Sequence, residues 1–582
     1  MNCPAHRGLS GLGVILALII LALTLAGCAQ DSGHAAASPP VTAQVSVPQH
    51  LSAAGEAALR GWIEAGQLPG LRWPNFSDHR LDAKNFYEPA GYVLAWVRGG
   101  QPTPQGLAIT EVFQQAASKG LGAEDYDAPR WAGRIARLRQ SSPPPSDSDL
   151  ANFDLALTVC VMRYINDLHI GKVNPKTFHF GLDIEQKKYN LPDFLRQKLV
   201  DADAQNVKTV LDGVEPPFEV YRRTQKALGI YEDLARRDDG EQLAVPLKPV
   251  GPGDPYPSLA RLARLLRLVG DLPPGAAIDS EPQIYQGALV DAVKRFQQRH
   301  GLDTDGRLGA ETVKQLNVPL SQRVEQLRLT LERWRWAPHD LGRPLVIVNI
   351  PEFVLRGWDE QNRTVLVMKV VLGKAYRHKT PVFFNQMRYV IFRPYWEVPP
   401  SIQRAELVPK IAKDSNYLAK NDFEVVDRNR QAVDGGAAGA EMLQRLRAGE
   451  LSIRQRPGRK NSLGLVKFLF PNEYNVYLHG TPAPELFKRS RRDFSHGCIR
   501  VESPVDLAVW VLKDNPEWTR ERILAAMNGG HPVPVNLAKP IPVLIFYGTA
   551  IVLENGEVGF FRDIYGHDAE LKEVLAKGYP YP

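Results

Sequence analysis

The sequence contains little cysteine and little methionine: four cysteines and six methionines in 582 residues. Cys3 and Cys28 stand near the N-terminus, so Cys160 and Cys498 are the two cysteines left for the rest of the chain. At most one disulfide could form between them, even in an oxidising compartment. A framework of disulfides therefore does not hold this chain together, and the surroundings of each cysteine become informative.

The sequence also lacks a strong charge of either sign. Lys and Arg number 71 against 64 Asp and Glu, a formal charge of +7. This mild excess suits an anionic polymer or a membrane surface, but many proteins without such partners have the same balance. We therefore expect no nucleic-acid partner. The length, with 44% hydrophobic and 23% charged residues, predicts a globular protein of about two to four domains.

One long apolar run stands at the N-terminus. Arg7 precedes the run GLGVILALIILALTLAG, which ends directly before Cys28. A basic start, an apolar core and small residues at its end predict a secretory signal peptide over residues 1–27, and the run is short for a membrane span. Residues 28–50 are small, polar and proline-bearing, so we expect a flexible tether there.

The ending LAGC resembles the lipobox of bacterial lipoproteins. This resemblance implies cleavage before Cys28 and lipidation of its sulfur, and the small neutral Ala29 and Gln30 imply sorting to the outer membrane. The expected location is therefore periplasmic, with a lipid anchor in the inner leaflet of the outer membrane. An ordinary signal peptide, with Cys28 incidental, is the alternative.

Helical periodicity dominates the first part of the body. Apolar residues recur at helical spacing over residues 51–245, which predicts a helical scaffold domain. Cys160 stands inside one such stretch, FDLALTVCVMRYINDL, where we expect a buried core thiol. A break rich in proline and glycine at about 245–258 then marks a domain boundary.

A small helical module is expected over residues 257–318. Its acidic sequence DTDG invites interpretation as a calcium loop, but Gly301 and Thr312 stand where that loop needs oxygen ligands. A turn between two helices explains the stretch better. The segment from Ala288 to Thr312 resembles the peptidoglycan-binding domain type 1, a three-helix module.

Downstream of the module the sequence is rich in β-branched and aromatic residues, which predicts strands. We expect a β-rich catalytic domain over residues 344–530. A more helical, glycine-bearing insertion at about 401–450 is a candidate lid. Residues 531–582 are expected to form a hairpin that packs on the scaffold and catalytic domains, with a type I′ turn at Asn555-Gly556.

The stretch DFSHGCIRV sets Cys498 among polar and basic residues, without the apolar stripe of a core helix. His479 ends the strand before it. Nearby histidines and arginines can lower the pKa of a thiol and so raise its thiolate fraction. Gly497 lets a substrate approach and frees backbone N–H groups to face an oxyanion. Acyl transfer through a thioester requires these parts: a base, a nucleophile and amide donors.

Three other interpretations of Cys498 are weaker. A zinc site with His479 and His496 lacks a fourth ligand of the right type, and the His-x-Cys spacing suits tetrahedral zinc poorly. We therefore expect no metal and no other cofactor. A buried structural cysteine would stand in an apolar stripe. A redox cysteine would need a resolving partner, and Cys160 lies in a different expected domain.

The stretch HGT … FSHGCIRV resembles the active-site motif of the L,D-transpeptidase (YkuD) catalytic domain. The stretches VNIPEFVL, VVLGKAYRHKTPVF and FRPYWEVPPSI fit the large subgroup of that family with a helical scaffold and a peptidoglycan-binding module. This resemblance implies a multidomain α+β fold class. Its parts are a mostly helical N-terminal scaffold, a small three-helix module and a β-rich catalytic domain with a helical lid insertion.

Carried over to this sequence, the resemblance implies Cys498 as the nucleophile and His479 as the base that activates it. His496, Gly497 and Arg500 complete the catalytic motif, with His496 in a supporting role. The residues expected to bind substrate are Tyr477, Trp396, Ser495 and Phe494. Core packing is the alternative for the aromatic residues Tyr477 and Trp396, although strand alternation puts Tyr477 on the side of His479.

The reaction that the resemblance implies starts with attack of Cys498 on the third residue of a peptidoglycan tetrapeptide stem, which releases D-alanine. An amine of a second stem then resolves the thioester into a 3–3 cross-link, and the enzyme should be sensitive to carbapenems. Peptidoglycan stems and glycan, a membrane reached through the lipid, and other cell-wall synthases are the expected partners. Alternatives are an L,D-carboxypeptidase, a wall-anchoring lipoprotein, and a Cys-His endopeptidase, which usually places its cysteine before its histidine.

Overall fold

The structure is a computed structural model that describes residues 49–582, apart from 141, 279–282, 377, 434–438 and 582. The expected signal peptide, Cys28 and nearly all of the tether lie outside these residues. The described residues belong to one compact unit. Within the described ranges, every helix falls short of the length and apolarity that a membrane crossing requires.

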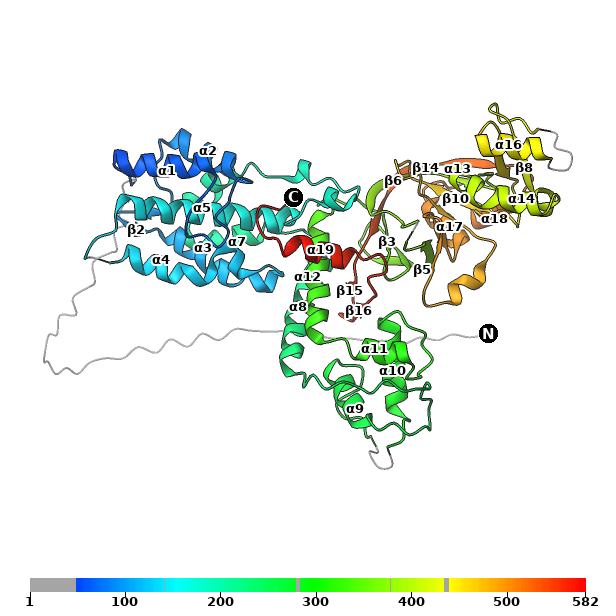
Figure 1. Ribbon diagram of the computed structural model, residues 1–582, viewed down its shortest axis with the longest axis horizontal. Coiled ribbons are helices and arrows are strands. Elements are labelled where there is room, and N and C mark those ends of the chain that lie inside the picture. The colour runs from blue at the N-terminus through cyan, green and yellow to red at the C-terminus, as the bar shows by residue number, and fades with distance from the viewer. Residues whose placement is uncertain (1–48, 141, 279–282, 377, 434–438, 582) are drawn as a thin grey trace, which may run out of the picture. The chain divides into compact units, whose positions relative to one another are not determined.

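The N-terminal part is a helical domain with its own apolar core (Figure 1). Helix α5 (Asp147–Ile170) begins with a capping box between Ser146 and Asp149 and is buried along most of its length. Around it lie α1 (Ala53–Ala65), α2 (Arg80–Tyr87), α3 (Pro104–Gln114), α4 (Trp131–Leu138), α6 (Leu191–Leu195), α7 (Val207–Asp212) and the ribbon of β1 (Val97–Arg98) and β2 (Gln101–Pro102). Cys160 of α5 is 1% exposed, and burial raises its pKa to about 12, which confirms the expected core thiol.

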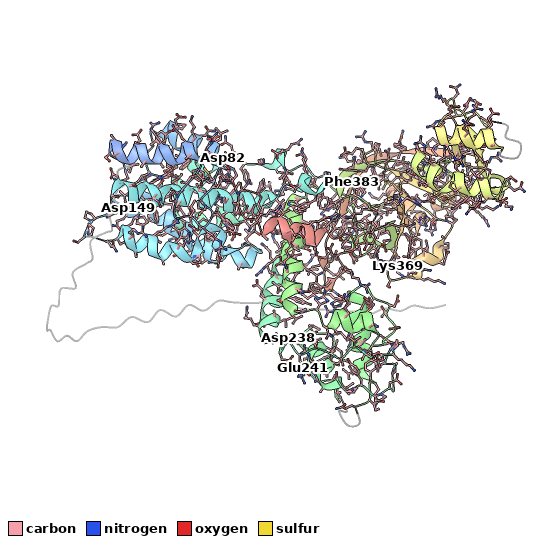
Figure 2. All side chains as sticks on the ribbon, in the orientation of Figure 1. Asp82, Asp149, Asp238, Glu241, Lys369 and Phe383 are labelled. Atoms are coloured by element: carbon pink, nitrogen blue, oxygen red, sulfur yellow. The ribbon has the colours of Figure 1, made fainter. Side chains whose placement is uncertain are left out.

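Two further helices, α8 (Glu219–Arg237) and α12 (Leu320–Trp336), pack along each other. Between them in the chain lies a module with its own apolar core. Its helices are α9 (Leu259–Leu268), α10 (Ala288–Arg299) and α11 (Ala310–Leu316). The Arg261 side chain ties α9 to the end of α8, because it donates to Asp238 at 3.0 Å and to the carbonyl oxygen of Glu241 at 2.7 Å (both labelled in Figure 2).

The DTDG stretch of the module forms a turn between α10 and α11. Gln297 of α10 donates to the Asp305 carboxylate at 2.8 Å and accepts from the Gly306 N–H at 2.8 Å. Gly306 has a φ of +70°, a conformation that favours glycine. The predicted turn between the two helices is therefore present.

The C-terminal part is built on a nine-stranded sheet in the order β12-β5-β13-β11-β10-β6-β14-β3-β4. Because β4 also pairs with β5, the sheet closes on itself. The strands are β3 (Leu345–Asn349), β4 (Val354–Trp358), β5 (Thr364–Gly373), β6 (Phe383–Phe392), β10 (Val466–Leu469), β11 (Leu478–His479), β12 (Asp493–Ser495), β13 (Ile499–Val501) and β14 (Val533–Phe546). Phe383, labelled in Figure 2, bridges to Gly181 of the helical domain.

The sheet continues past residue 530, where the catalytic domain was expected to end. Strand β14 lies between β6 and β3, antiparallel to the first and parallel to the second. The apolar sequence IPVLIF therefore completes the sheet and is not one arm of a terminal hairpin. The boundary expected at 530 is corrected to the end of β14, at Phe546. Helices α17 (Pro504–Val511) and α18 (Arg520–Asn528) precede this strand.

The insertion after β7 (Trp396–Glu397) contains strands as well as helices. Strands β7, β9 (Ser452–Gln455) and β8 (Phe423–Val426) form a three-stranded sheet with its own apolar core. Its helices are α13 (Pro400–Ile402), α14 (Val408–Lys413), α15 (Tyr417–Lys420) and α16 (Ala440–Ala448). The expected helical lid is thus a small α/β subdomain, whose strands of two to four residues are too short to show a clear alternation in the sequence.

The C-terminal hairpin is shorter than expected and joins β15 (Ala550–Val552) to β16 (Val558–Phe560), followed by α19 (His567–Leu575). Gly556 has a φ of +84°, whereas Asn555 does not take a positive φ, so the type I′ prediction is wrong. The Gly556 N–H donates to the Leu553 carbonyl at 3.0 Å, and the Leu553 N–H donates to the Glu557 carbonyl at 2.9 Å. This pattern is a type I turn followed by a glycine bulge.

Candidate active site

The site lies where β11 and β13 run side by side. Their parallel pairing sets His479 opposite Arg500 and Leu478 opposite Ile499. Leu478 and Ile499 are both fully buried in the core of the sheet. The Ile499 N–H donates to the Tyr477 carbonyl at 3.1 Å, which extends the same register by one residue toward the N-terminal end of both strands.

Side chains alternate between the two faces of a strand, so the neighbours of Leu478 and Ile499 point away from that core. Strand β10 contributes a further residue to this outer face, because Lys467 is opposite His479 in the antiparallel pairing of β10 with β11. The outer face therefore carries five residues, which we call the site face: Lys467, Tyr477, His479, Cys498 and Arg500.

His479 and Cys498 are diagonal neighbours on the site face. The backbones of diagonal neighbours on adjacent strands lie about 7–8 Å apart, a separation that longer side chains can span. In this structure the Cys498 thiol donates to the carbonyl oxygen of Asn475, with 3.7 Å between sulfur and oxygen. The shared face puts both side chains on one side of the sheet, which proton transfer from Cys498 to His479 needs, and the transfer itself stays a prediction.

The turn before Cys498 is held from within. Gly497 has a φ of +116°, a backbone conformation that residues other than glycine rarely adopt. The Ser495 hydroxyl accepts from the Gly497 N–H at 3.1 Å and donates to the Cys498 carbonyl at 2.6 Å. Ser495 is 3% exposed, and both bonds of its hydroxyl go to the turn. The Ser495 hydroxyl thus clamps this turn, and the expected contact of Ser495 with substrate stays a prediction.

Opposing effects act on the pKa of the partly exposed Cys498 thiol. Burial raises its pKa above that of an ordinary thiol. The backbone N–H and the hydroxyl of Tyr477, together with the charges of Lys467 and Arg500, favour the thiolate and partly offset that increase. The Cys498 side chain is therefore a thiol whose ionised form would have donors and cations around it.

His479 is buried and neutral. Burial, with a smaller contribution from the charge of Arg500, lowers its pKa to about 3. Its Nδ1 lies 2.6 Å from the carbonyl oxygen of Gly480, and since a carbonyl only accepts, Nδ1 carries the hydrogen. In this tautomer Nε2 keeps its lone pair, as a general base requires, and the backbone of Leu463 is a second hydrogen-bond partner of the ring.

Arg500 and Lys467 supply positive charge to the site face. Burial lowers the pKa of both, and the thiolate form of Cys498 opposes that decrease. The Nε atom of Arg500 is buried and has no hydrogen-bond partner in the part of the chain that the structure describes. The Lys467 ammonium lies 4.4 Å from the centre of the Tyr477 ring. Both cations can therefore attract an anionic group near Cys498.

Lys467 was missed by reasoning from the sequence. It stands in VKFLF, where an apolar strand shows one polar residue at the position that alternation assigns to the outer face. That polar position was the available signal. The sequence distance from Lys467 to Cys498 hid its relevance, because only the pairing of β10 with β11 brings it to the site.

His496 connects the turn to the insertion. Its Nε2 lies 2.5 Å from the Glu406 carboxylate, and its ring centre lies 4.8 Å from that of His378. Burial alone would raise the pKa of Glu406, but the hydrogen bond and charge of His496 hold it below its usual value. His496 therefore bonds to the subdomain that was expected to be a lid.

The three aromatic residues expected to bind substrate have different surroundings. The Tyr477 ring lies on the site face, with its centre 5.8 Å from that of His479. Trp396 lies in the small sheet of the insertion and packs near Phe423, at 6.1 Å between ring centres, as the packing alternative predicts. The Phe494 ring lies under the guanidinium of Arg489 at 5.3 Å. Substrate contact by any of the three stays a prediction.

A metal centre finds no support in the geometry. Among the residues that the structure describes, no group of three or more His, Cys, Asp or Glu side chains is placed to hold a metal ion. The polar groups of the site face are instead a thiol, a neutral imidazole and two cations, groups that acyl transfer can use.

Similarity to known families agrees with this arrangement. Residues 343–535 match the family model described as "L,D-transpeptidase catalytic domain", named YkuD. Residues 82–228 match the model "Scaffold domain", and residues 258–316 match "Putative peptidoglycan binding domain". A curated protein of Haemophilus influenzae, "Putative L,D-transpeptidase", is 30% identical over 273 residues, which is 46% of this chain. The chain spans about half, 53%, of the length of that relative.

Among solved structures, the L,D-transpeptidase of Xylanimonas cellulosilytica matches with 14% identity, over 53% of this chain and 98% of that one. The TM-score is 0.17, too low to support a statement about a shared fold. The family models and the geometry of the site face carry the assignment. Residues 343–535 are thus similar to L,D-transpeptidase catalytic domains of the YkuD family, and the same chain carries regions similar to a scaffold domain and to a peptidoglycan-binding domain.

Proposed function

We propose that this protein is an L,D-transpeptidase that forms 3–3 peptidoglycan cross-links through a thioester on Cys498. The observation that carries the proposal is the shared face of Cys498 and His479, flanked by two cations, within a matched transpeptidase domain. Attack by the Cys498 sulfur on the carbonyl of the third stem residue releases the terminal D-alanine. A side-chain amine of a second stem then displaces the sulfur.

Two features of the chain favour peptidoglycan as the substrate. The match of residues 258–316 to a peptidoglycan-binding model provides a second attachment to the same polymer. Linkage of two binding sites in one chain can raise avidity by about two to four orders of magnitude. The cations Lys467 and Arg500 would attract the carboxylates of the stem peptide.

The location and the lid belong to the same proposal. The lipobox-like sequence at Cys28 would anchor the enzyme in the outer membrane, facing the periplasm. Residues 28–50 would be the tether between the lipid and the folded domains. The bond from His496 to Glu406 gives the insertion a contact next to the nucleophile, and this contact favours its role as a lid over the donor stem. Labelling with radioactive palmitate in cells, for the native chain and Cys28→Ser, tests the anchor.

The reaction is tested with a purified disaccharide-tetrapeptide and mass spectrometry of the products. A dimer that has lost one D-alanine supports transpeptidation, and a tripeptide without dimer supports L,D-carboxypeptidation. An unchanged substrate would leave a wall-binding protein as the better account. Cys498→Ala should abolish both products, whereas Cys160→Ala, which removes the buried thiol of α5, should retain them.

A further inference from the structure

The carbonyl oxygen of Gly497 is held by a residue outside the catalytic motif. The Thr380 hydroxyl donates to this oxygen at 2.8 Å and accepts from the Gly373 N–H at 3.0 Å. Thr380 is fully buried, and 117 residues separate it from Gly497 in the sequence. The hydroxyl thus donates one hydrogen bond to the backbone and accepts another from it. These two bonds fix the orientation of the Thr380 side chain.

The hydrogen bond from Thr380 to the Gly497 oxygen also fixes the direction of the Cys498 N–H. The peptide between Gly497 and Cys498 is a rigid plane in which the C=O and the N–H point in opposite directions. A hydrogen bond that holds the Gly497 oxygen therefore also aims the Cys498 N–H. The N–H of a nucleophilic residue is well placed to donate to the oxyanion that forms when its own side chain attacks a carbonyl.

Close packing leaves this peptide little freedom. A side chain on Gly373 would place its Cβ 1.7 Å from the His378 carbonyl oxygen and 3.0 Å from the Cα of Gly497. The first distance is far shorter than atoms tolerate, and the second is a tight contact, so the end of β5 approaches the turn closely because Gly373 has no side chain. Thr380 and Gly373 together form one wall of the turn that presents Cys498.

Tyr565 holds that wall from the far end of the chain. Its hydroxyl donates to the Gly373 carbonyl at 2.7 Å and accepts from the Thr380 N–H at 3.2 Å. It is 4% exposed and lies after the terminal hairpin, 185 residues beyond Thr380. One phenol therefore fixes the backbone of both residues that contact the Gly497 region.

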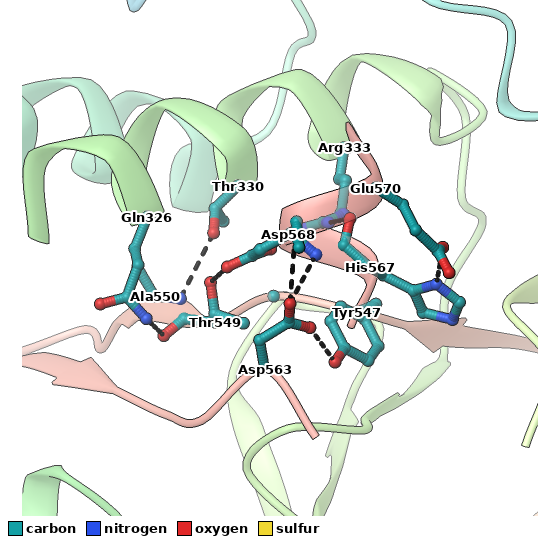
Figure 3. Close-up of polar contacts among 12 residues, drawn as sticks. Gln326, Thr330, Arg333, Tyr547, Thr549, Ala550, Asp563, His567, Asp568 and Glu570 are labelled. Carbon is teal, nitrogen blue, oxygen red and sulfur yellow. Dashed lines mark hydrogen bonds and ion pairs between the residues drawn. The ribbon is translucent and has the colours of Figure 1, made fainter. Parts of the chain in front are cut away.

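Tyr565 is itself anchored through Tyr547, which belongs to the polar network drawn in Figure 3. Its N–H donates to the Tyr547 hydroxyl at 2.9 Å, and that hydroxyl donates to Asp563 at 2.6 Å. Asp563 accepts from the Asp568 N–H at 3.0 Å, and Asp568 accepts from Arg333 of α12 at 2.5 Å. Continuous contacts thus run from the connecting helix α12 to the turn that carries the nucleophile.

We propose that Thr380 is a positioning residue that aims the Cys498 N–H at the oxyanion, and that Tyr565 fixes Thr380 in this role. The inference rests on the proposed function, since it concerns the acylation step of that reaction. It gives the C-terminal segment a part in catalysis that lies outside the matched residues 343–535.

The step that depends on this aim is addition of sulfur to the stem carbonyl. The Cys498 sulfur forms a bond to carbon, the π pair of the carbonyl moves to its oxygen, and the thiol proton passes to His479. Collapse of this intermediate restores the carbonyl and breaks the C–N bond, and the leaving amine of D-alanine takes the proton from His479. The Cys498 N–H contributes only while the oxygen carries negative charge.

The test compares two reactions of one sulfur. Acylation by disaccharide-tetrapeptide passes through an oxyanion, whereas alkylation by iodoacetamide displaces iodide and forms none. Removal of one oxyanion donor slows acyl transfer by about 10²–10³-fold. For Thr380→Val, which loses the hydroxyl and keeps the shape, we expect acylation to slow by about tenfold or more, with the alkylation rate within about twofold of the native value.

Two variants complete the comparison. Thr380→Ser restores the hydroxyl and should recover most of the acylation rate, and Tyr565→Phe should slow acylation with alkylation preserved. Thr364→Val is the matched control, because Thr364 lies on β5 and bonds to Glu554 away from the turn. Far-ultraviolet circular dichroism and the thermal midpoint report whether each variant is folded.

The outcomes separate this inference from the proposed function. If the native enzyme forms no acyl-enzyme with the tetrapeptide, the proposed function fails and the inference fails with it. If the native enzyme is acylated and Thr380→Val is acylated at the native rate, the inference alone is overturned. Equal losses of acylation and alkylation in Thr380→Val would also overturn it, because they would indicate a general disturbance of Cys498.

Discussion

Glu406 of the insertion accepts a hydrogen bond at 2.5 Å from His496, two residues before Cys498. The two side chains are 39% and 27% exposed, so solvent weakens the pair without removing it. It is a direct bond between the candidate lid and the turn at Cys498. Its strength should therefore influence how often the insertion opens.

The first prediction concerns this bond. Glu406→Gln keeps the shape of the side chain and removes its charge, so we expect faster amide hydrogen exchange in residues 396–455 and a KM raised by about two- to fivefold, as the loss of about 1 kcal/mol implies. Asp414→Asn is the control, because Asp414 pairs with Lys420 inside the insertion and has no bond to the turn. Native exchange rates in Glu406→Gln would contradict the prediction.

The second prediction concerns the ionisation of Cys498. Because burial raises its pKa, the rate of alkylation by iodoacetamide should rise with pH to a midpoint above that of an ordinary thiol. Lys467→Met should move the midpoint further up, since the lysine charge favours the thiolate. The exposed Lys539 gives the matched control Lys539→Met, which should leave the midpoint unchanged. A midpoint below that of an ordinary thiol in the native chain would refute the prediction.

The motif around Cys498 was readable from the sequence because its parts are close together in the chain. Ser495, Gly497 and Cys498 form one turn, and their hydrogen bonds join residues two or three positions apart. Residue types at short spacing therefore predicted a nucleophile on a turn with freed N–H groups. The sequence did not reveal that the Ser495 hydroxyl is used within the turn, since a serine there can equally face a substrate.

The residues that contact the motif could not be recognised in the sequence, because only the fold brings them close to it. Thr380 lies 117 residues before Gly497 in the sequence, and Tyr565 lies 67 residues after Cys498. Neither belongs to a recognisable pattern of reactive residues. The helical domain, in contrast, was predicted directly from apolar periodicity, because the residues that form the buried face of an amphipathic helix are close together in the sequence. Strand pairing is non-local, so the position of β14 inside the sheet could not be inferred from its apolar run alone.

The third prediction tests whether Ser495 acts by holding the turn or by binding substrate. Ser495→Ala removes both hydrogen bonds of the turn and should lower kcat by about tenfold or more, with KM within about twofold of the native value, since each bond contributes about 1 kcal/mol. Ser495→Thr keeps the hydroxyl and is the conservative control. Steady-state kinetics with the disaccharide-tetrapeptide distinguish the roles. A raised KM with native kcat would instead assign Ser495 to substrate binding.

The fourth prediction follows from the buried, neutral His479. In the unfolded chain a histidine holds its proton below about pH 6.5, whereas folded His479 holds one only below about 3. Between these values the unfolded state binds more protons, so acid lowers the free energy of unfolding. His479→Gln cannot bind that proton, and its stability should therefore fall less steeply from pH 7 to 5 than that of the native chain.

Urea unfolding at each half unit of pH measures these slopes. Other buried histidines, such as His300, contribute to the native slope in the same direction, because burial lowers the pKa of His300 as well. They are present in both proteins and cancel in the difference between His479→Gln and the native chain. If that difference stayed constant from pH 7 to 5, His479 would be protonated alike in both states. It would then be a cation beside Arg500 at pH 5, which its burial opposes, and the assignment of His479 as the neutral base would have to be withdrawn.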